Sequence, residues 1–179
     1  MPEPRPWKVL RERPVADCRV FAVTALDARR EGVDGEHTFY RVDSVDWVQV
    51  VALTAADEVV LVRQWRHGAG APVLEVPSGM VDPGEDPADA ARRELAEETG
   101  YRAARWRSLG SVNPNPALFR NRLHTFVAEG CAPAGGQETD PHEEIAVELV
   151  PRAAIPDLLR GGRIDHALAR ASLYRWLLG

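Results

Sequence analysis

The 179-residue sequence is poor in cysteine, in long apolar runs and in net positive charge. Its two cysteines, Cys18 and Cys131, lie far apart without metal-ligand spacing, so buried or bystander thiols are favoured over a disulfide or a nucleophile. No run of about 18 apolar residues could span a bilayer, and the start MPEPRPWKVL lacks the apolar stretch of a signal peptide. We therefore expect a cytoplasmic protein without a membrane partner.

The formal net charge of -5 argues against a protein that binds nucleic acid by neutralising phosphates. The apolar fraction of 45% and the charged fraction of 27% are ordinary for a globular protein. A chain of this length can build one substantial core and does not demand a second independent domain. Composition alone thus favours one compact domain with a small molecule as its partner.

Several segments have the alternating pattern of β-strands. Residues 1–14 are rich in proline and charge and are expected to form an arm, followed by an antiparallel hairpin of residues 17–28 and 36–44. The Val-rich runs 45–54 and 58–66 predict strands buried in the middle of a sheet. Further strands are expected around residues 105–112, 121–129 and 143–150.

One helix is predicted over residues 86–100. Asp86 is a suitable N-cap, a proline follows at the first helical position, and Gly100 supplies the C-terminal stop. Ala91 and Leu95 share a side of this helix that can pack against the sheet.

A second helix is predicted in the tail, over residues 165–179. Asp165 is its candidate N-cap. The face expected to pack on the core consists of Ala167, Ala171, Tyr174 and Leu178.

The first helix places three carboxylates, Glu94, Glu97 and Glu98, on one strip of its surface. A solvated face laced with ion pairs is the ordinary explanation, but like charges at these spacings cost roughly 0.2–0.5 kcal/mol per pair. Hard divalent cations such as Mg²⁺ take carboxylate oxygens and share their remaining positions with water and substrate phosphates. A bound cation converts the repulsion into a binding site, so the strip is a candidate metal site.

The acidic strip belongs to a longer pattern. Gly79 is followed by five residues and Glu85, then by seven residues and the run RELAEETG, which ends at Gly100. This pattern resembles the Nudix box, and its sole departure is Tyr101 where an aliphatic residue is usual. The resemblance implies an α+β fold, an α/β/α sandwich whose mixed central sheet lies between helices, with an N-terminal antiparallel hairpin or sheet. It also implies an enzyme that hydrolyses a nucleoside diphosphate linked to another group.

The same resemblance assigns roles within the box. Arg93 would orient the glutamates, Glu94 and Glu98 would bind metal, and Glu97 would act as a ligand or as the base. The backbone carbonyl of Ser78 resembles a further family ligand. The implied cofactor is Mg²⁺, with Mn²⁺ as a substitute.

Glycines before the helix allow a tight loop. Gly79 and Gly84 let the backbone turn, and Glu85 can then pair with Arg93 to hold the loop against the helix.

The general base has more than one candidate. A carboxylate within hydrogen-bond reach of the attacking water is needed, which could be Glu97, or Glu143 or Glu144 from the loop DPHEE. Exposed charge at the start of a strand explains the loop pair equally well.

The approach to the box indicates a subfamily. LVRQWR followed by LEVPSGMVDPGE resembles ADP-ribose pyrophosphatases and their nucleotide-sugar relatives, with Ser78 in place of the usual alanine. Pro116 lies close to where that subfamily carries a characteristic proline, although turn formation alone explains a proline in NPNPAL. The implied substrate is ADP-ribose or a related nucleoside diphosphate sugar.

Other substrate contacts are less specific. Arg66 is the candidate for gripping the diphosphate. Trp47, Phe39 or Tyr40 could stack on a base or ribose, with core packing as the alternative for each. His124 lies within an alternating strand, which favours a structural role.

The resemblance also suggests an organisation. Residues 1–44 would form the arm and hairpin, contributing to a homodimer and to its substrate site, and residues 45–179 would form the catalytic domain. Two other functions stay open: hydrolysis of another substrate of the class, such as GDP-mannose or a dinucleotide, and a non-catalytic nucleotide sensor.

Overall fold

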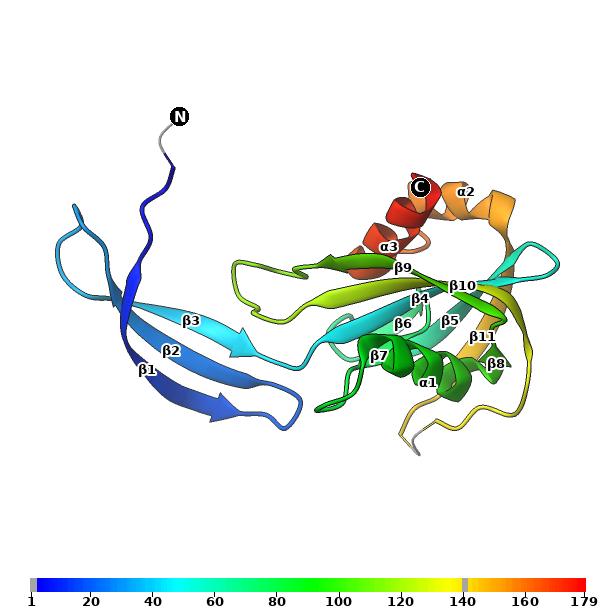
Figure 1. The fold of residues 1–179 in the computed structure, drawn as a ribbon, viewed down its shortest axis with the longest axis horizontal. Coiled ribbons are helices and arrows are strands. Elements are labelled where there is room, and N and C mark those ends of the chain that lie inside the picture. Colours follow the sequence, from blue (N-terminus) through cyan, green and yellow to red (C-terminus); the bar gives the residue numbers. More distant parts are fainter. Residues whose placement is uncertain (1–2, 140–141) are drawn as a thin grey trace. The chain divides into compact units, whose positions relative to one another are not determined.

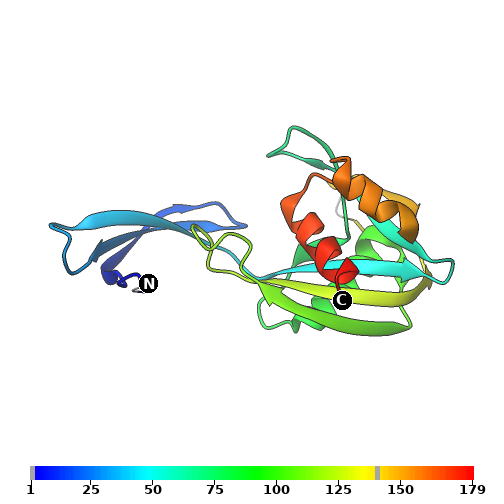
Figure 2. The ribbon, with the colours of Figure 1, turned by 90° about the horizontal axis from the view of Figure 1, so that it is seen from above.

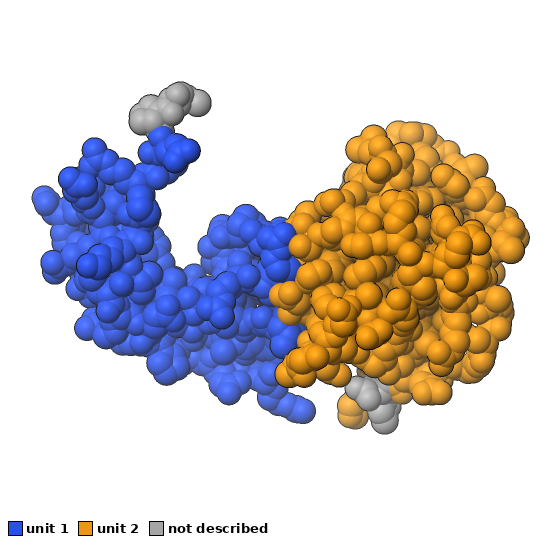
Figure 3. All heavy atoms as spheres, viewed as in Figure 1, with its two compact units in different colours: residues 1–45, 113–122 blue, residues 46–112, 123–179 orange. Residues whose placement is uncertain are grey.

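The computed structural model describes residues 3–139 and 142–179 of the chain. The chain forms two compact units, one of residues 1–45 and 113–122 and one of residues 46–112 and 123–179 (Figure 3). Length and composition favoured one compact domain. The structure instead has two units, and residues 113–122 belong to the first unit with the N-terminal residues, not to the second unit with the segments that flank them.

The first unit is built on an antiparallel sheet. Within its described residues this sheet has three strands in the order β1-β2-β3, which are β1 (Lys8–Asp17), β2 (Ala22–Arg29) and β3 (His37–Asp43) (Figure 1). The sequence predicted an arm over residues 1–14, but residues 8–14 belong to β1 and pair with β2. Proline is compatible with this strand because β1 is an edge strand and Pro14 borders a register shift.

Two charged side chains of β1 bind a residue of the neighbouring strand β2. Arg11 and Arg13 each donate from Nε to Oδ2 of Asp27 at 2.9 Å, and the Thr38 hydroxyl donates to Oδ1 of the same carboxylate at 2.8 Å. The donor from Arg13 contributes most to holding the pKa of Asp27 well below its usual range. The arginines that marked an arm in the sequence therefore hold a buried aspartate.

The segment 113–122 attaches to the third strand of this unit. The backbone amide of Val42 donates to the carbonyl of Leu118 at 2.8 Å, and the side-chain amide of Asn121 donates to the carbonyl of Val45 at 2.8 Å.

The second unit contains a mixed sheet. Its described residues form eight strands, with the path β11-β5-β4-β10-β8 and with β6 on β5, β7 on β4 and β9 on β10. The strands are β4 (Trp47–Thr54), β5 (Glu58–Arg66), β6 (Ala71–Glu75), β7 (Ser78–Met80), β8 (Tyr101–Arg102), β9 (Arg105–Val112), β10 (Leu123–Pro133) and β11 (Ile145–Pro151). β4 and β10 run parallel, whereas the other pairs are antiparallel.

Helices cover both faces of this sheet. They are α1 (Pro87–Thr99), a 3₁₀ turn (Arg152–Ala154), α2 (Ile155–Arg160) and α3 (Ala167–Leu177). Figure 2 shows α2 and α3 together on one face, and Figure 1 shows α1 on the other. None of the described helices is long and apolar enough to cross a membrane.

The central strand β4 is buried on both sides because its alternate residues face opposite layers. The layer toward α1 includes Val48, Val50, Ala52, Ala90, Ala91 and Leu95. The layer toward α2 and α3 includes Val51, Leu53, Ile155, Leu159, Leu173 and Trp176. The predicted α/β/α sandwich, its mixed sheet and the packing of Ala91 and Leu95 on that sheet are confirmed.

The details of the C-terminal helix were predicted wrongly. His166, not Asp165, is the N-cap residue, and its side chain makes no capping hydrogen bond. The predicted core face is exposed, with Tyr174 40% and Leu178 87% accessible. The buried residues are Ala169, Ser172, Leu173 and Trp176. Apolar residues lie all round this helix, so periodicity alone could not choose the face, and the larger Leu173 and Trp176 side chains bury more area.

Candidate active site

The acidic helix begins and ends as the sequence predicted. The Asp86 carboxylate accepts a hydrogen bond from the backbone amide of Ala88 at 2.7 Å. Gly100 closes the helix with φ 71°, and its amide donates to the carbonyl of Ala96. These two local caps fix where the glutamates fall along the helix axis.

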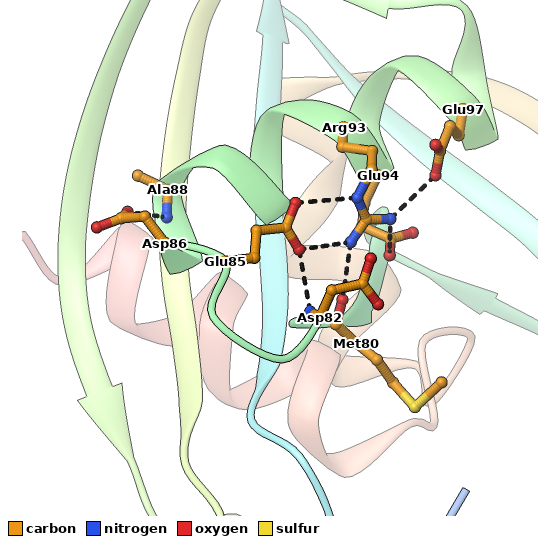
Figure 4. A network of polar contacts seen from close by, with 8 residues as sticks. All are labelled: Met80, Asp82, Glu85, Asp86, Ala88, Arg93, Glu94 and Glu97. Atoms are coloured by element: carbon orange, nitrogen blue, oxygen red, sulfur yellow. Dashed lines mark hydrogen bonds and ion pairs between the residues drawn. The ribbon is translucent and has the colours of Figure 1, made fainter.

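Arg93 joins the box loop to the helix (Figure 4). Its Nε and Nη2 atoms donate to the two carboxylate oxygens of Glu85 at 3.0 and 2.9 Å, so the predicted pair is confirmed. Nη2 also donates to the carbonyl of Met80 at 2.9 Å. Nη1 donates to Glu94 at 2.8 Å and to Glu97 at 3.1 Å. One guanidinium therefore fixes the loop and two of the three clustered carboxylates.

The Glu94 carboxylate lies directly against the backbone of Gly79. A Cβ atom at position 79 would stand 2.0 Å from Cδ of Glu94, so only glycine leaves room for this side chain. Burial raises the pKa of Glu94, and the hydrogen bond from Arg93 opposes that effect.

Glu98 is the most enclosed member of the cluster, with 6% of its surface exposed. Its Oε2 accepts from the backbone amide of Ser78 at 2.9 Å, and its Oε1 accepts from the side-chain amide of Gln64 at 3.4 Å. Burial raises the pKa of Glu98 to about 8, against the opposing effect of the Ser78 amide. A carboxylate kept this far from water is suited to a cation as its partner.

The glutamates open onto a cleft of about 940 Å³ within the second unit. Of the residues singled out in the sequence, the cleft brings together Trp47, Arg66, Ser78, Gly79, Arg93, Glu94, Glu97, Glu98 and Glu143. Glu144 is exposed and does not line it. Pro116, Phe39 and Tyr40 belong to the first unit.

The cleft also contains residues to which sequence reasoning assigned no role. Gln64, Glu75 and His166 all line it, from β5, β6 and the residue before α3. The available signal for Glu75 was a charged residue inside the otherwise apolar run PVLEV, and for His166 a polar pair just before a helix.

Hydrogen bonds tie Gln137 and Glu138, which precede Glu143 in the chain, to the end of α1. The side-chain amide of Gln137 donates to the carbonyl of Glu98 at 2.6 Å and to the carbonyl of Ile145 at 3.0 Å. The backbone amide of Glu138 donates to the carbonyl of Glu97 at 2.9 Å. These bonds satisfy free carbonyls at the helix end and fix the loop start to the acidic helix.

The chemistry of the donors fits a divalent cation, although the side chains do not converge on one point. Within residues 3–139 and 142–179, no group of three or more His, Cys, Asp or Glu side chains is arranged to hold a metal ion. The reason is visible in the contacts: Glu94 and Glu97 turn to Arg93, and Glu98 turns to the Ser78 amide. The set nevertheless offers hard oxygen atoms and a buried carboxylate whose protein partners are uncharged.

The fold and this box together define a class of protein. Residues 44–177 match the family model described as the NUDIX domain. The chain therefore belongs to the Nudix family, and it is an enzyme, a Nudix hydrolase.

Individual relatives are similar over most of the chain. It is 31% identical over 158 residues to the CMP-5'-(N-acetyl-N-hydroxy-3-aminopropyl)phosphonate hydrolase of Streptomyces rubellomurinus, covering 88% of this chain and 75% of that protein. It is 32% identical over 157 residues to the ADP-ribose pyrophosphatase of Mycobacterium tuberculosis, covering 86% and 75%. A crystal structure of an ADP compounds hydrolase matches with a TM-score of 0.85 at 26% identity, covering 100% of this chain and 98% of that one.

Proposed function

We propose that this Nudix hydrolase cleaves the pyrophosphate bond of ADP-ribose, or of a related nucleoside diphosphate sugar, in a Mg²⁺-dependent reaction. The products are a nucleoside monophosphate and a sugar phosphate, and Mn²⁺ can substitute for Mg²⁺. The observation that carries the proposal is the meeting of the box glutamates with Arg66 and Glu143 in one cleft. The names of the ADP-ribose pyrophosphatase and the ADP compounds hydrolase support the choice of ADP-ribose.

The metal site of the proposal consists of Glu94, Glu97, Glu98 and the Ser78 carbonyl. A cation there would offset the charge of the phosphate oxygens and lower the pKa of the attacking water. Arg93 holds Glu94 and Glu97 in place, and the Gly79 backbone leaves the space that Glu94 occupies.

The remaining residues bind substrate and move the proton. The Arg66 guanidinium binds the diphosphate, and Trp47 offers a ring at the cleft wall for stacking. The water oxygen bonds to one phosphorus while the bridging P–O bond breaks, and the leaving phosphate keeps the bonding electron pair. Glu97 or Glu143 accepts the proton that the water releases.

The first unit supplies the second part of the proposal. We assign residues 1–44 to dimerisation and residues 45–179 to catalysis, with Pro116 and the N-terminal sheet completing the substrate site in a homodimer. Exposed large apolar side chains are frequent on this unit and include Val9, Leu10, Val15, Val20, Phe21, Phe39 and Tyr40. Light scattering on the purified protein should give twice the chain mass of 19.7 kDa, and a monomer at micromolar concentration would contradict the assignment.

The variant Glu98→Gln tests the catalytic proposal. Glutamine keeps the shape and can still accept from the Ser78 amide, but it removes the negative charge that a cation needs, so turnover of ADP-ribose should fall by about 100-fold or more. Release of the nucleoside monophosphate is followed at saturating Mg²⁺, with ADP-ribose, GDP-mannose and a dinucleotide as the panel. Glu129→Gln, in an exposed pair with Arg105 at 3.3 Å, is the matched control.

Two results would overturn the proposal. One is near-normal turnover by Glu98→Gln, or by the wild type in excess chelator. The other is wild-type protein that binds ADP-ribose and the rest of the panel but cleaves none of it, which would identify a nucleotide sensor.

A further inference from the structure

A buried carboxylate in the cleft wall, that of Glu75, has been given no role so far. The Glu75 side chain is fully enclosed, with 0% of its surface exposed. Arg66 donates to it as a fork, from Nε to Oε1 at 2.7 Å and from Nη2 to Oε2 at 3.0 Å. Burial opposes ionisation, but contacts from His166 and Arg66 hold the pKa of Glu75 at about 2, so it is a carboxylate at neutral pH.

The same carboxylate also holds a histidine. Nδ1 of His166 lies 2.8 Å from Oε2 of Glu75. Nδ1 is itself buried and forms no hydrogen bond of good geometry within the described residues, but the 2.8 Å distance makes Oε2 of Glu75 the acceptor that it approaches. The rest of the side chain is 33% exposed and lines the cleft. Because Nδ1 is buried, Nε2 is the ring nitrogen that is left to meet a ligand in the cleft.

This arrangement fixes what the exposed nitrogen of His166 can do. In a neutral imidazole one nitrogen carries the proton and the other accepts a hydrogen bond. A carboxylate beside Nδ1 selects the tautomer with the proton on Nδ1, since a carboxylate only accepts. Nε2 is then a hydrogen-bond acceptor that faces the cleft, and its natural partner is a hydroxyl group, not a phosphate oxygen.

Glu75 thus places two groups of different chemistry side by side. The Arg66 guanidinium is a cation with donors only, which suits a diphosphate. His166 offers an acceptor next to it, which suits the hydroxyls of a sugar attached to that diphosphate. We propose that His166 accepts a hydrogen bond from a hydroxyl of the sugar in a nucleoside diphosphate sugar, and that buried Glu75 is the positioning residue for both His166 and Arg66. This inference rests on the proposed function and adds the residue that recognises the sugar.

The test compares a ligand that carries a sugar on the far side of the diphosphate with a ligand that ends at the diphosphate. ADP-ribose and ADP are titrated calorimetrically into the full-length protein in EDTA, so that binding is measured without hydrolysis. His166→Leu, which removes the acceptor, should raise the Kd of ADP-ribose about tenfold and leave the Kd of ADP within about twofold. His166→Gln, which restores an acceptor oxygen, should recover most of the ADP-ribose affinity.

Two further variants separate positioning from general structure. Glu75→Gln should weaken the binding of both ligands, because Arg66 and His166 both lose the carboxylate that they contact. If Glu75 acts through His166, the double variant Glu75→Gln, His166→Leu should raise the Kd of ADP-ribose by less than the product of the two single effects. His124→Leu is the matched control, since His124 also faces a carboxylate, Asp46 at 2.9 Å, but does not line the cleft.

Each outcome has a defined meaning. Equal weakening of ADP-ribose and ADP by His166→Leu would place His166 at the diphosphate and overturn the inference, as would unchanged affinity for both. Wild-type protein that binds ADP-ribose without cleaving any of the panel refutes the proposed function while the binding comparison still decides the inference. If another nucleotide sugar is the one cleaved, it and its nucleoside diphosphate replace the two ligands. Wild-type protein that neither binds nor cleaves the panel refutes both.

Discussion

Replacing Gly79 by alanine should reduce activity on the order of 100-fold while leaving the fold nearly intact. The new Cβ would lie 2.0 Å from Cδ of Glu94. The carboxyl group must therefore retreat by about 1.5 Å to reach an ordinary contact distance. The backbone of Gly79 lies outside the positive-φ region, so alanine adds no conformational strain of its own. The three nearest atoms all belong to the carboxyl group at the end of the flexible Glu94 side chain.

The two expected magnitudes differ sharply. Moving Glu94 costs its hydrogen bond from Arg93, about 1 kcal/mol, because Arg93 keeps its fork on Glu85. For a chain of this size that corresponds to a fall in Tm of about 2–4 °C. A displacement of about 1 Å in a catalytic group, by contrast, can reduce the rate on the order of 100-fold. Gly79→Ala should therefore separate catalysis from stability.

The assay pairs AMP release from ADP-ribose with thermal unfolding of the same samples. Gly136→Ala is the control, because a Cβ there meets nothing within 4 Å and its φ is ordinary. The reasoning is refuted if Gly79→Ala retains turnover within about threefold of wild type. It is also refuted if Tm falls by more than about 10 °C, since the conflict would then involve more than one side chain.

Two predictions concern stability. Gly100→Ala should destabilise the protein by about 2–4 kcal/mol, because its φ of 71° disfavours a side chain and its Cβ would stand 2.6 Å from the carbonyl oxygen of Gly135. Gly84→Ala, with φ 85° but no neighbour within 4 Å, should cost only about 1 kcal/mol, and equal losses in urea unfolding would contradict this explanation. In the first unit the pKa of Asp27 is lowered, so its contribution to stability is complete above its unfolded pKa and is lost as pH falls below that value. When the pH is lowered below about 4, the hydrogen-exchange protection of β1 to β3 should therefore decrease in the wild type. The variant Asp27→Asn should have lower protection at neutral pH and should not show that decrease.

The sequence was most informative where the structure is local. The box and its helix occupy residues 79–100, and the hydrogen bonds that cap the helix and hold the box loop join residues close in the chain. Asp86 caps an amide two residues away, and Glu85 meets Arg93 eight residues away. Such contacts follow from backbone geometry and residue spacing, so they could be predicted without knowing the fold.

The buried faces of helices and the partners of charged side chains were harder to predict. The prediction of the buried face of α3 was wrong because apolar residues lie all round this helix. Only the position of the sheet selects Leu173 and Trp176 for burial. Residues 8–14 read as an arm because their charge is normally solvated. Their arginines instead converge on Asp27, and that pairing depends on strand register.

The sequence by itself determined how the acidic helix presents its carboxylates, because three glutamates at helical spacing behind a glycine loop are set by local rules. Only the tertiary structure decided which side chains face them across the cleft. Arg66, Glu75 and His166 come from β5, β6 and the start of α3, and up to 100 residues separate them in the chain. Their meeting depends on strand pairing and on the packing of α3, which are long-range interactions that residue spacing does not encode.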